Sequence, residues 1–285
     1  MLIEKEYDIV NDLEFFLEAQ KTDIESFSKN TNISKTTIYK LLKSRKTTKE
    51  NYERIYSYIY RCGYRVNKVK EEFLKETNKR ILFHGSKYGL NEISEEGSRS
   101  TCDFGNGFYL GASFSNAAAF ICENPDSSVY SFELSTDNLK ILQFDTSLDW
   151  MLAICYYRGT IKNYNSSNKI AEIVKQIQSA DIIIAPIADN RMFYIMSLFA
   201  NGDITSEVAI HSLSASFMGK QYVIKTSEAM KHLKPIEKYY LCQEEKNDYI
   251  DALNKRTQEI ETKLKMAKRT YRDGLFIEEI LKWEN

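Results

Sequence analysis

Apolar residues recur at helical spacing through about the first 75 positions of the chain, with charged residues between them. Residues 23–45 predict two short helices joined by a tight turn. Ser34 is a favourable N-cap for the second of these helices, which would bury Ile38. A third helix is expected to follow from Thr48. The pattern therefore predicts an all-helical N-terminal domain.

The spacing changes between about residues 80 and 240, where short β-rich runs appear among helical stretches. Five runs are expected to form strands: Arg80–His84, Ser128–Leu134, Leu139–Phe144, Asp181–Ala185 and Gln221–Lys225. Together with the helical N-terminal part, these runs predict an α+β protein. Strand spacing alone supports a mixed α and β domain and goes no further.

The last part of the sequence is charged and again has helical spacing. Its apolar positions are Tyr249, Leu253, Ile260, Leu264 and Ala267. We expect an amphipathic helix that packs on the preceding domain, with a docking helix for a partner protein as the alternative. The expected domains are residues 1–76, 77–242 and 243–285.

The distribution of charge distinguishes one segment of the chain. The whole chain has a net charge of −1. Between Lys21 and Lys70, however, thirteen Lys and Arg residues stand against four Asp and Glu residues, a local balance of +9. A basic segment in a nearly neutral protein is the electrostatic pattern expected for contacts with phosphate groups.

Several classes of protein are disfavoured by composition. The five cysteines contain no C-x-x-C pair, their number is odd, and no histidine stands at a ligand spacing from them, so neither a zinc site nor a disulfide framework is expected. The first residues lack the basic and apolar regions of a signal peptide, and no apolar run is long enough to span a bilayer. We therefore expect a cytoplasmic protein with no membrane association.

The N-terminal pattern resembles the helix-turn-helix of the Cro and phage-repressor type, with Ser34–Ser44 as the recognition helix. In that motif the first residues of the second helix reach base edges in the major groove of DNA. The resemblance assigns this role to Lys35, Thr36, Thr37 and Lys40. A small helical bundle that docks a protein is the alternative interpretation.

Three separated motifs carry the candidate chemistry. The first is a strand that ends in His84, Gly85 and Ser86. The second runs from Asp103 through a glycine turn, with Gly107, to Tyr109, and continues into a helix. The third places Gln221 at the start of a strand. Each motif is weak alone, and their order and spacing together are far more specific.

These motifs resemble the His-Tyr-Glu class of ADP-ribosyltransferases, which includes diphtheria toxin and the poly-ADP-ribose polymerases. The resemblance covers about residues 80–232. It is closest to an uncharacterised bacterial family with the pattern R-x-x-x-D-F-G-x-G-F-Y. It implies a split pair of β-sheets around an NAD⁺ cleft, NAD⁺ as substrate, no metal, and a neutralising antitoxin encoded nearby.

The resemblance also implies roles for single residues. Gly85 would offer its backbone to the nicotinamide carboxamide, while His84 and Ser86 would contact the adenosine ribose. The rings of Tyr109 and Phe120 would sandwich the nicotinamide, a flat cation that gains from aromatic faces. Gly107 would line the same NAD⁺ site.

Gln221 would hold the nicotinamide-ribose hydroxyl while the glycosidic bond breaks. It stands where many relatives have Glu, so it offers a dipole in place of a full charge toward the oxocarbenium-like transition state. Polymer formation is therefore not expected. Ala117 is a second departure, since many relatives have a Ser there that bonds the carboxamide.

Polar residues near these motifs leave two interpretations open. Arg99 would pair with the NAD⁺ pyrophosphate, and Asp103 would cap the loop or act as a general base. A mutual ion pair between them is the alternative. Asp189 and Arg191 follow a buried run and are expected to border the acceptor side, with a loop-capping Asp and a surface Arg as the alternative.

The resemblance thus implies a mono-ADP-ribosyltransferase, the toxin of a bacterial toxin–antitoxin or phage-defence system, which modifies a nucleic acid or a protein. An NAD⁺ glycohydrolase shares the same donor site and remains open. So does a transcriptional regulator that binds NAD⁺ or ADP-ribose without turnover, which the Gln221 and Ala117 departures favour.

Overall fold

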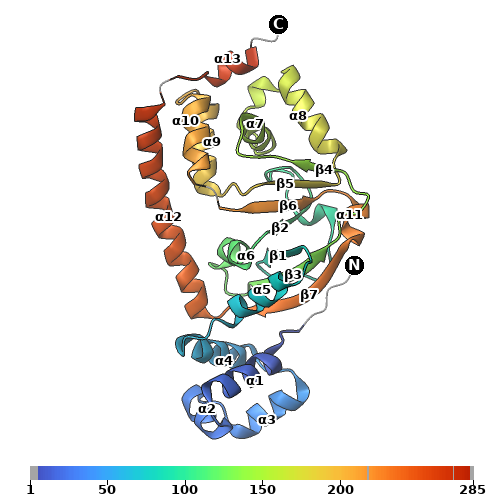
Figure 1. Cartoon of the computed structure of the whole chain (residues 1–285), viewed down its shortest axis with the longest axis vertical. Coiled ribbons are helices and arrows are strands. Elements are labelled where there is room, and N and C mark those ends of the chain that lie inside the picture. The colour runs from blue at the N-terminus through green and yellow to red at the C-terminus, as the bar shows by residue number, and fades with distance from the viewer. Residues whose placement is uncertain (1–5, 217, 272, 283–285) are drawn as a thin grey trace.

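The computed structural model describes residues 6–216, 218–271 and 273–282, which form a mixed α and β protein (Figure 1). Five helices come first: α1 (Ile9–Gln20), α2 (Ile24–Thr31), α3 (Lys35–Ser44), α4 (Lys49–Arg61) and α5 (Val66–Glu76). Helices α1 to α4 lie at one end of the molecule, and α5 leads from them toward the sheet (Figure 1).

Side-chain caps explain where three of these helices begin. Asp23, Ser34 and Thr48 each accept a hydrogen bond from the backbone N–H three residues later, which satisfies one of the free donors of the first turn. The expected N-cap at Ser34 is therefore confirmed. Phe16 and Phe27 are fully buried between the helices, with ring centroids 5.9 Å apart.

Seven strands form one sheet in the order β4-β5-β6-β2-β1-β3-β7. Their bounds are β1 (Ile81–Ser86), β2 (Phe108–Gly111), β3 (Ser128–Leu134), β4 (Ile141–Gln143), β5 (Ile182–Pro186), β6 (Lys220–Ile224) and β7 (Leu233–Tyr240). The five expected strands are confirmed, each within a few residues. The expectation omitted β2 and β7.

The expectation of two separate sheets is wrong, although the sheet is nearly divided. Between β1 and β2 the register holds one residue pair, Phe83 with Gly111, whereas β1 and β3 share six. We call this weak junction the seam. Because one pair still connects the strands, the two halves remain a single sheet.

Helices cover one face of the sheet on both sides of the seam. The β4-β5-β6-β2 half carries α7 (Leu148–Tyr157), α8 (Asn168–Ser179), α9 (Asn190–Ala200) and α10 (Ser206–Ser214). The other half carries α6 (Phe114–Ile121), which packs on β1. The opposite face buries a smaller cluster beneath the segment around Ile93 and α11 (Ser227–Lys231).

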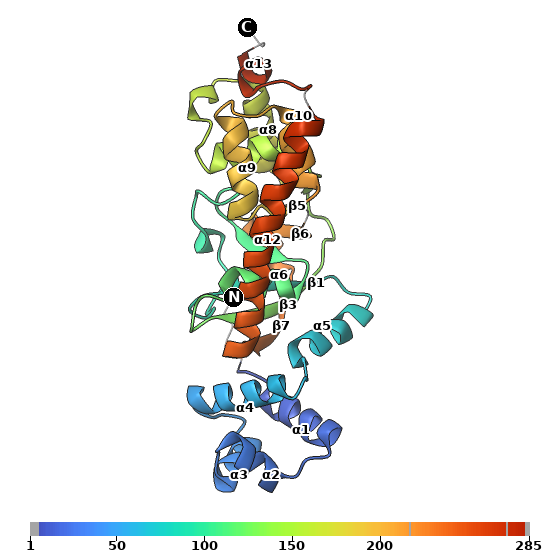
Figure 2. The ribbon, with the colours of Figure 1, turned by 90° about the vertical axis from the view of Figure 1, so that its left-hand side faces the viewer.

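The long helix α12 (Gln243–Thr270) runs along one side of the molecule and is followed by α13 (Ile277–Lys282) (Figure 2). It contacts α4 near its start, then α6, and then α9 and α10. Its Ile260, Leu264 and Ala267 are buried, which confirms the expected amphipathic helix packed on the rest of the chain. Among the described helices, none combines the length and the apolar character needed to cross a bilayer.

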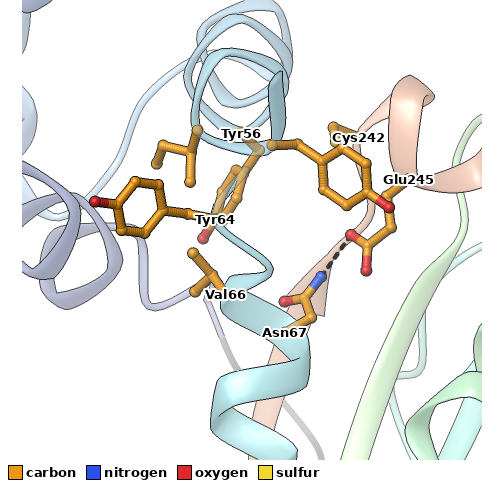
Figure 3. A pocket seen from close by; sticks show the side chains of 8 residues that line it. Tyr56, Tyr64, Val66, Asn67, Cys242 and Glu245 are labelled. Atoms are coloured by element: carbon orange, nitrogen blue, oxygen red, sulfur yellow. Dashed lines mark hydrogen bonds between the residues drawn. The ribbon is translucent and has the colours of Figure 1, made fainter. Parts of the chain in front are cut away.

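Polar contacts join the start of α12 to the N-terminal helices (Figure 3). Asn67 donates from Nδ2 to Glu245 Oε2 and to the carbonyl of Tyr240, both at 2.8 Å. Arg61 pairs with Glu244 at 3.1 Å. Burial raises the pKa of Glu245 to about 8. The N-terminal helices are thereby attached to the rest of the protein by buried and exposed polar groups.

Candidate active site

His84 bridges the seam with its side chain. Its Nδ1 lies 2.8 Å from the carbonyl oxygen of Tyr109, and because that oxygen can only accept, Nδ1 must carry the proton. The imidazole also stacks on Phe108, with centroids 4.4 Å apart. Burial lowers the pKa of His84, so the ring is neutral at pH 7 and Nε2 keeps a lone pair for a ligand donor.

Gly85 and Ser86 lie in β1 just beyond the single pair that closes the seam. Both have partners in β3 and neither has a registered partner in the described β2. A Cβ added to Gly85 would lie 2.4 Å from the carbonyl oxygen of Ala117, so only glycine lets α6 approach this strand. The Ser86 hydroxyl donates to the carbonyl of Gly89 and shapes the turn that follows.

Tyr109 holds the loop that precedes its own strand. Its hydroxyl donates to the carbonyl of Gly105 at 2.7 Å and accepts from the backbone N–H of Phe104 at 3.1 Å. Gly105 has a φ of +73°, which a glycine adopts without strain. Burial raises the pKa of Tyr109, so the phenol is fully protonated and acts as a structural donor.

A buried polar cluster connects the second and third motifs. Gln221 donates from Nε2 to Asp103 Oδ2 at 2.8 Å and to the carbonyl of Pro186 at 3.0 Å. Arg158 donates from Nε to Asp103 Oδ1 at 2.8 Å and from Nη2 to the same oxygen. Sequence positions 103, 158 and 221 thus meet at one point on the helical face of the sheet.

This cluster corrects the suggested ion pair between Arg99 and Asp103. Arg99 is exposed in the loop, and the Asp103 carboxylate is used by Arg158 and Gln221. Sequence reasoning missed Arg158, which caps the C-terminal end of α7 and lies 55 positions from Asp103. The sequence signal that could have indicated Arg158 is a charged residue directly after an apolar helix.

Lys225 was also missed, and it fixes the other side of the same loop. Its Nζ donates to the carbonyl of Phe104 at 2.7 Å and to that of Asn106. Burial lowers the pKa of Lys225. Gly107 lies against β6, where an added Cβ would be 2.8 Å from Val223 Cγ1. The loop from Asp103 to Gly107 is therefore held at both ends before any ligand binds.

Asp189 and Arg191 have structural partners of their own. Asp189 caps α9, accepting from the backbone of Arg191 at 3.0 Å and of Met192 at 2.9 Å. The Arg191 guanidinium bonds to Asp189 and to Thr257 of α12, so it is not a free surface group. The turn still adjoins the polar cluster, because the carbonyl of Ala188 accepts from Arg158 at 2.7 Å.

Two aromatic side chains stand out from the surface near β1. Phe120 of α6 is 72% exposed, and Tyr88, in the turn after β1, is 83% exposed. The ammonium group of Lys87 lies 5.9 Å from the centroid of the Phe120 ring. Phe120 is therefore a solvent-facing ring on α6, the helix that packs on β1.

The candidate DNA-contacting residues lie at the start of α3. Lys35, Thr36 and Lys40 are exposed, and Lys35 pairs with Glu25 at 3.1 Å. Thr37 is partly used by the cap, since its hydroxyl lies 2.8 Å from that of Ser34. These positions share one exposed end of the molecule, remote from the seam (Figure 1).

The chain is thus an α+β protein whose sheet is nearly divided, beside a cluster in which a half-buried Arg158 joins the buried Asp103 and, through it, Gln221. Residues 80–234 match the family described as "Protein of unknown function (DUF3990)". The match covers more than half of the 285 residues, so the chain belongs to that family. Comparisons with curated proteins and with solved structures returned no match.

Proposed function

We propose that the protein is an NAD⁺-dependent mono-ADP-ribosyltransferase whose donor site lies at the seam. The observation that carries this proposal is the open side of β1 at Gly85 and Ser86, flanked by the neutral His84 imidazole. A strand edge without a partner offers backbone donors and acceptors to a planar carboxamide. The motif order described above supports the same assignment.

Under this proposal, each residue around the seam would contact one part of NAD⁺. His84 Nε2 would accept from a ribose hydroxyl, because Nδ1 is already used. Gly85 would bond the carboxamide, and Ser86 and Gly107 would line the same cleft. Tyr109 and Phe120 would present ring faces to the nicotinamide. Arg99, exposed in the loop before Asp103, would bond to the pyrophosphate.

Gln221 would act at the bond that breaks. Its amide nitrogen is used by Asp103 and Pro186, so the amide oxygen is the atom offered to a ribose hydroxyl. The glycosidic C–N bond breaks and its electron pair leaves with neutral nicotinamide. The acceptor then gives an electron pair to the anomeric carbon and loses a proton. A fixed dipole near the developing positive charge lowers the barrier.

We also propose that α1 to α4 form a DNA-binding helix-turn-helix domain. The capped α3, its exposed Lys35, Thr36, Thr37 and Lys40, and the basic balance of this segment support the proposal. Asp189 and Arg191 would border the acceptor side, next to the Ala188 carbonyl. In a cell we expect a toxin that a neighbouring antitoxin neutralises.

The test is release of nicotinamide from NAD⁺ labelled in the adenosine half, with DNA, RNA, cell extract or no acceptor. Label carried onto one acceptor class, together with nicotinamide release, supports a transferase. Release without an acceptor identifies a glycohydrolase. Binding of NAD⁺ without release leaves the ligand-sensing regulator. His84→Ala should abolish release, and His232→Ala, remote from the seam, is the matched control.

A further inference from the structure

The side chain at position 221 is a hydrogen-bond donor toward a carboxylate. Both acceptors of Gln221 Nε2, Asp103 Oδ2 and the Pro186 carbonyl, lack a hydrogen to donate. They therefore fix which end of the amide is nitrogen. A carboxylate at this position would have no hydrogen for either acceptor. Glutamine is thus demanded by its neighbours.

Asp103 is paired with a cation in this buried place. It is 7% exposed, and the guanidinium of Arg158 binds it through two nitrogens. The same guanidinium donates to the Ala188 carbonyl and lies 4.3 Å from the centroid of the Phe193 ring. A bidentate, stacked arginine is the partner that compensates a buried carboxylate best.

We propose that Asp103 supplies, through the amide of Gln221, the negative charge that residue 221 itself lacks. This inference rests on the proposed transferase function. Asp103 is a positioning residue: its bond to Nε2 polarises the amide and places more negative charge on Oε1. Arg158 in turn fixes Asp103. Neither residue needs to touch the substrate.

Introduction of the usual glutamate of this enzyme class should therefore be harmful here. In a Gln221→Glu variant, two carboxylates would face each other across a hydrogen-bond distance, and Pro186 would lose its donor. Two such groups cannot both ionise without cost. We therefore expect the substitution to reduce both stability and turnover.

Other charged and titratable groups surround the pair. Arg158 comes from α7, and Lys225 from the end of β6 holds the loop that contains Asp103. Asp189 and Arg191 neutralise each other at the start of α9. The phenols of Tyr109 and Tyr157 lie nearby, with the pKa of each raised by burial. Arg158 is thus the cation bonded directly to the pair.

The experiment compares four full-length proteins: the unaltered chain, Gln221→Glu, Asp103→Asn, and the double variant that carries both changes. Melting temperature and the kcat and KM for nicotinamide release are measured between about pH 5 and pH 8. The double variant exchanges the two groups, since the new amide at position 103 can donate to a carboxylate at position 221. It therefore keeps one negative charge and one amide.

We expect Asp103→Asn to lower kcat by about 10- to 100-fold with little change in KM, because the side chain keeps its size but loses both the charge and the acceptor for Gln221 Nε2. Gln221→Glu should melt lower than the unaltered chain at pH 8 and recover toward pH 5, where the two carboxylates share a proton. The double variant should melt higher than Gln221→Glu at pH 8 and regain turnover.

Two results would overturn the inference. One is a Gln221→Glu variant as stable and at least as active as the unaltered chain. The other is a double variant no better than Gln221→Glu, which would assign Asp103 a merely structural role. Absence of nicotinamide release by the unaltered chain is a separate result: it overturns the proposed function, and this inference with it.

Discussion

The imidazole of His84 donates to the carbonyl of Tyr109 across the point where β1 and β2 separate. This 2.8 Å bond joins two halves of the sheet that share one registered backbone pair. A side chain thus replaces part of the backbone ladder. If the proposed donor site is correct, stability of the seam and binding of NAD⁺ would both depend on this one residue.

Replacement of His84 by Ala should destabilise the protein by about 1–3 kcal/mol, because the carbonyl of Tyr109 loses its donor and Phe108 loses its stacking partner. Urea unfolding measures this change. His232→Ala should change it by less than about 0.5 kcal/mol. An equal effect of both substitutions would show that the bond at the seam contributes nothing measurable.

The pH dependence of the same variant gives a second prediction. The pKa of His84 is lowered in the folded protein, so its contribution to stability is present above about pH 6.5 and is lost as the pH falls through the folded value. The free energy of unfolding should therefore fall more steeply in acid for the unaltered chain than for His84→Ala. If the free energies of unfolding of the two proteins fell in parallel with pH, the lowered pKa of His84 would be contradicted.

Gly85→Ala tests the close approach of α6 to β1. The new methyl group would lie 2.4 Å from the Ala117 carbonyl, so α6 must move, at a cost of about 1–3 kcal/mol. Gly97→Ala is the matched control, because an added Cβ there has no neighbour within 4 Å. Thermal unfolding should show a lower melting temperature for Gly85→Ala and an unchanged one for Gly97→Ala.

Because Glu245 is buried, we expect the protein to lose stability as the solution becomes alkaline. The Glu245 pKa of about 8 in the folded protein lies above its ordinary value because of burial, so the neutral form is the stabilising one. Its contribution is full below about pH 4.5 and is lost as the pH rises through 8. Glu245→Gln keeps an acceptor for Asn67 and should melt higher than the unaltered chain at pH 9. If the melting temperatures of Glu245→Gln and the unaltered chain differed by the same amount at pH 6 and at pH 9, this explanation would be refuted.

The proposed DNA contacts predict a change in salt dependence. Lys35→Glu with Lys40→Glu should weaken binding to duplex DNA and reduce the slope of log affinity against log salt by about 2. A control pair of equal charge change, Lys175→Glu with Lys265→Glu, lies on α8 and α12 and should leave the slope unaltered. Fluorescence anisotropy at several salt concentrations measures both. Equal losses for the two pairs would indicate a general charge effect.

Local signals in the sequence were sufficient for much of the fold. The hydroxyl of Ser34 caps α3 as expected, because a cap depends on residues three positions apart. Strand β7 is not predictable from the pattern, because Pro235 and a register shift opposite Ser131 and Phe132 interrupt its alternation of apolar and polar residues. Strand β2 is not predictable either, because its four residues are too few to show a period.

The candidate site was predictable to a lesser degree. The motifs single out His84, Tyr109 and Gln221 as candidates, but the one partner that the sequence suggests for Asp103, as an alternative, is the nearer Arg99. Arg158 lies 55 positions away, and only the packing of α7 on the sheet brings it to Asp103. Contacts of this kind are set by tertiary structure, for which a single sequence carries no spacing rule.

Helix α12 has 28 residues, a length of about 42 Å at the usual rise, and it touches α4, α6, α9 and α10 in turn. One rigid rod therefore contacts the helices at the proposed DNA end, the helix that backs Gly85 and the helices beyond the polar cluster. This helix begins after residue 234, so the element that joins the N-terminal helices to the helix behind Gly85 lies outside the matched family segment.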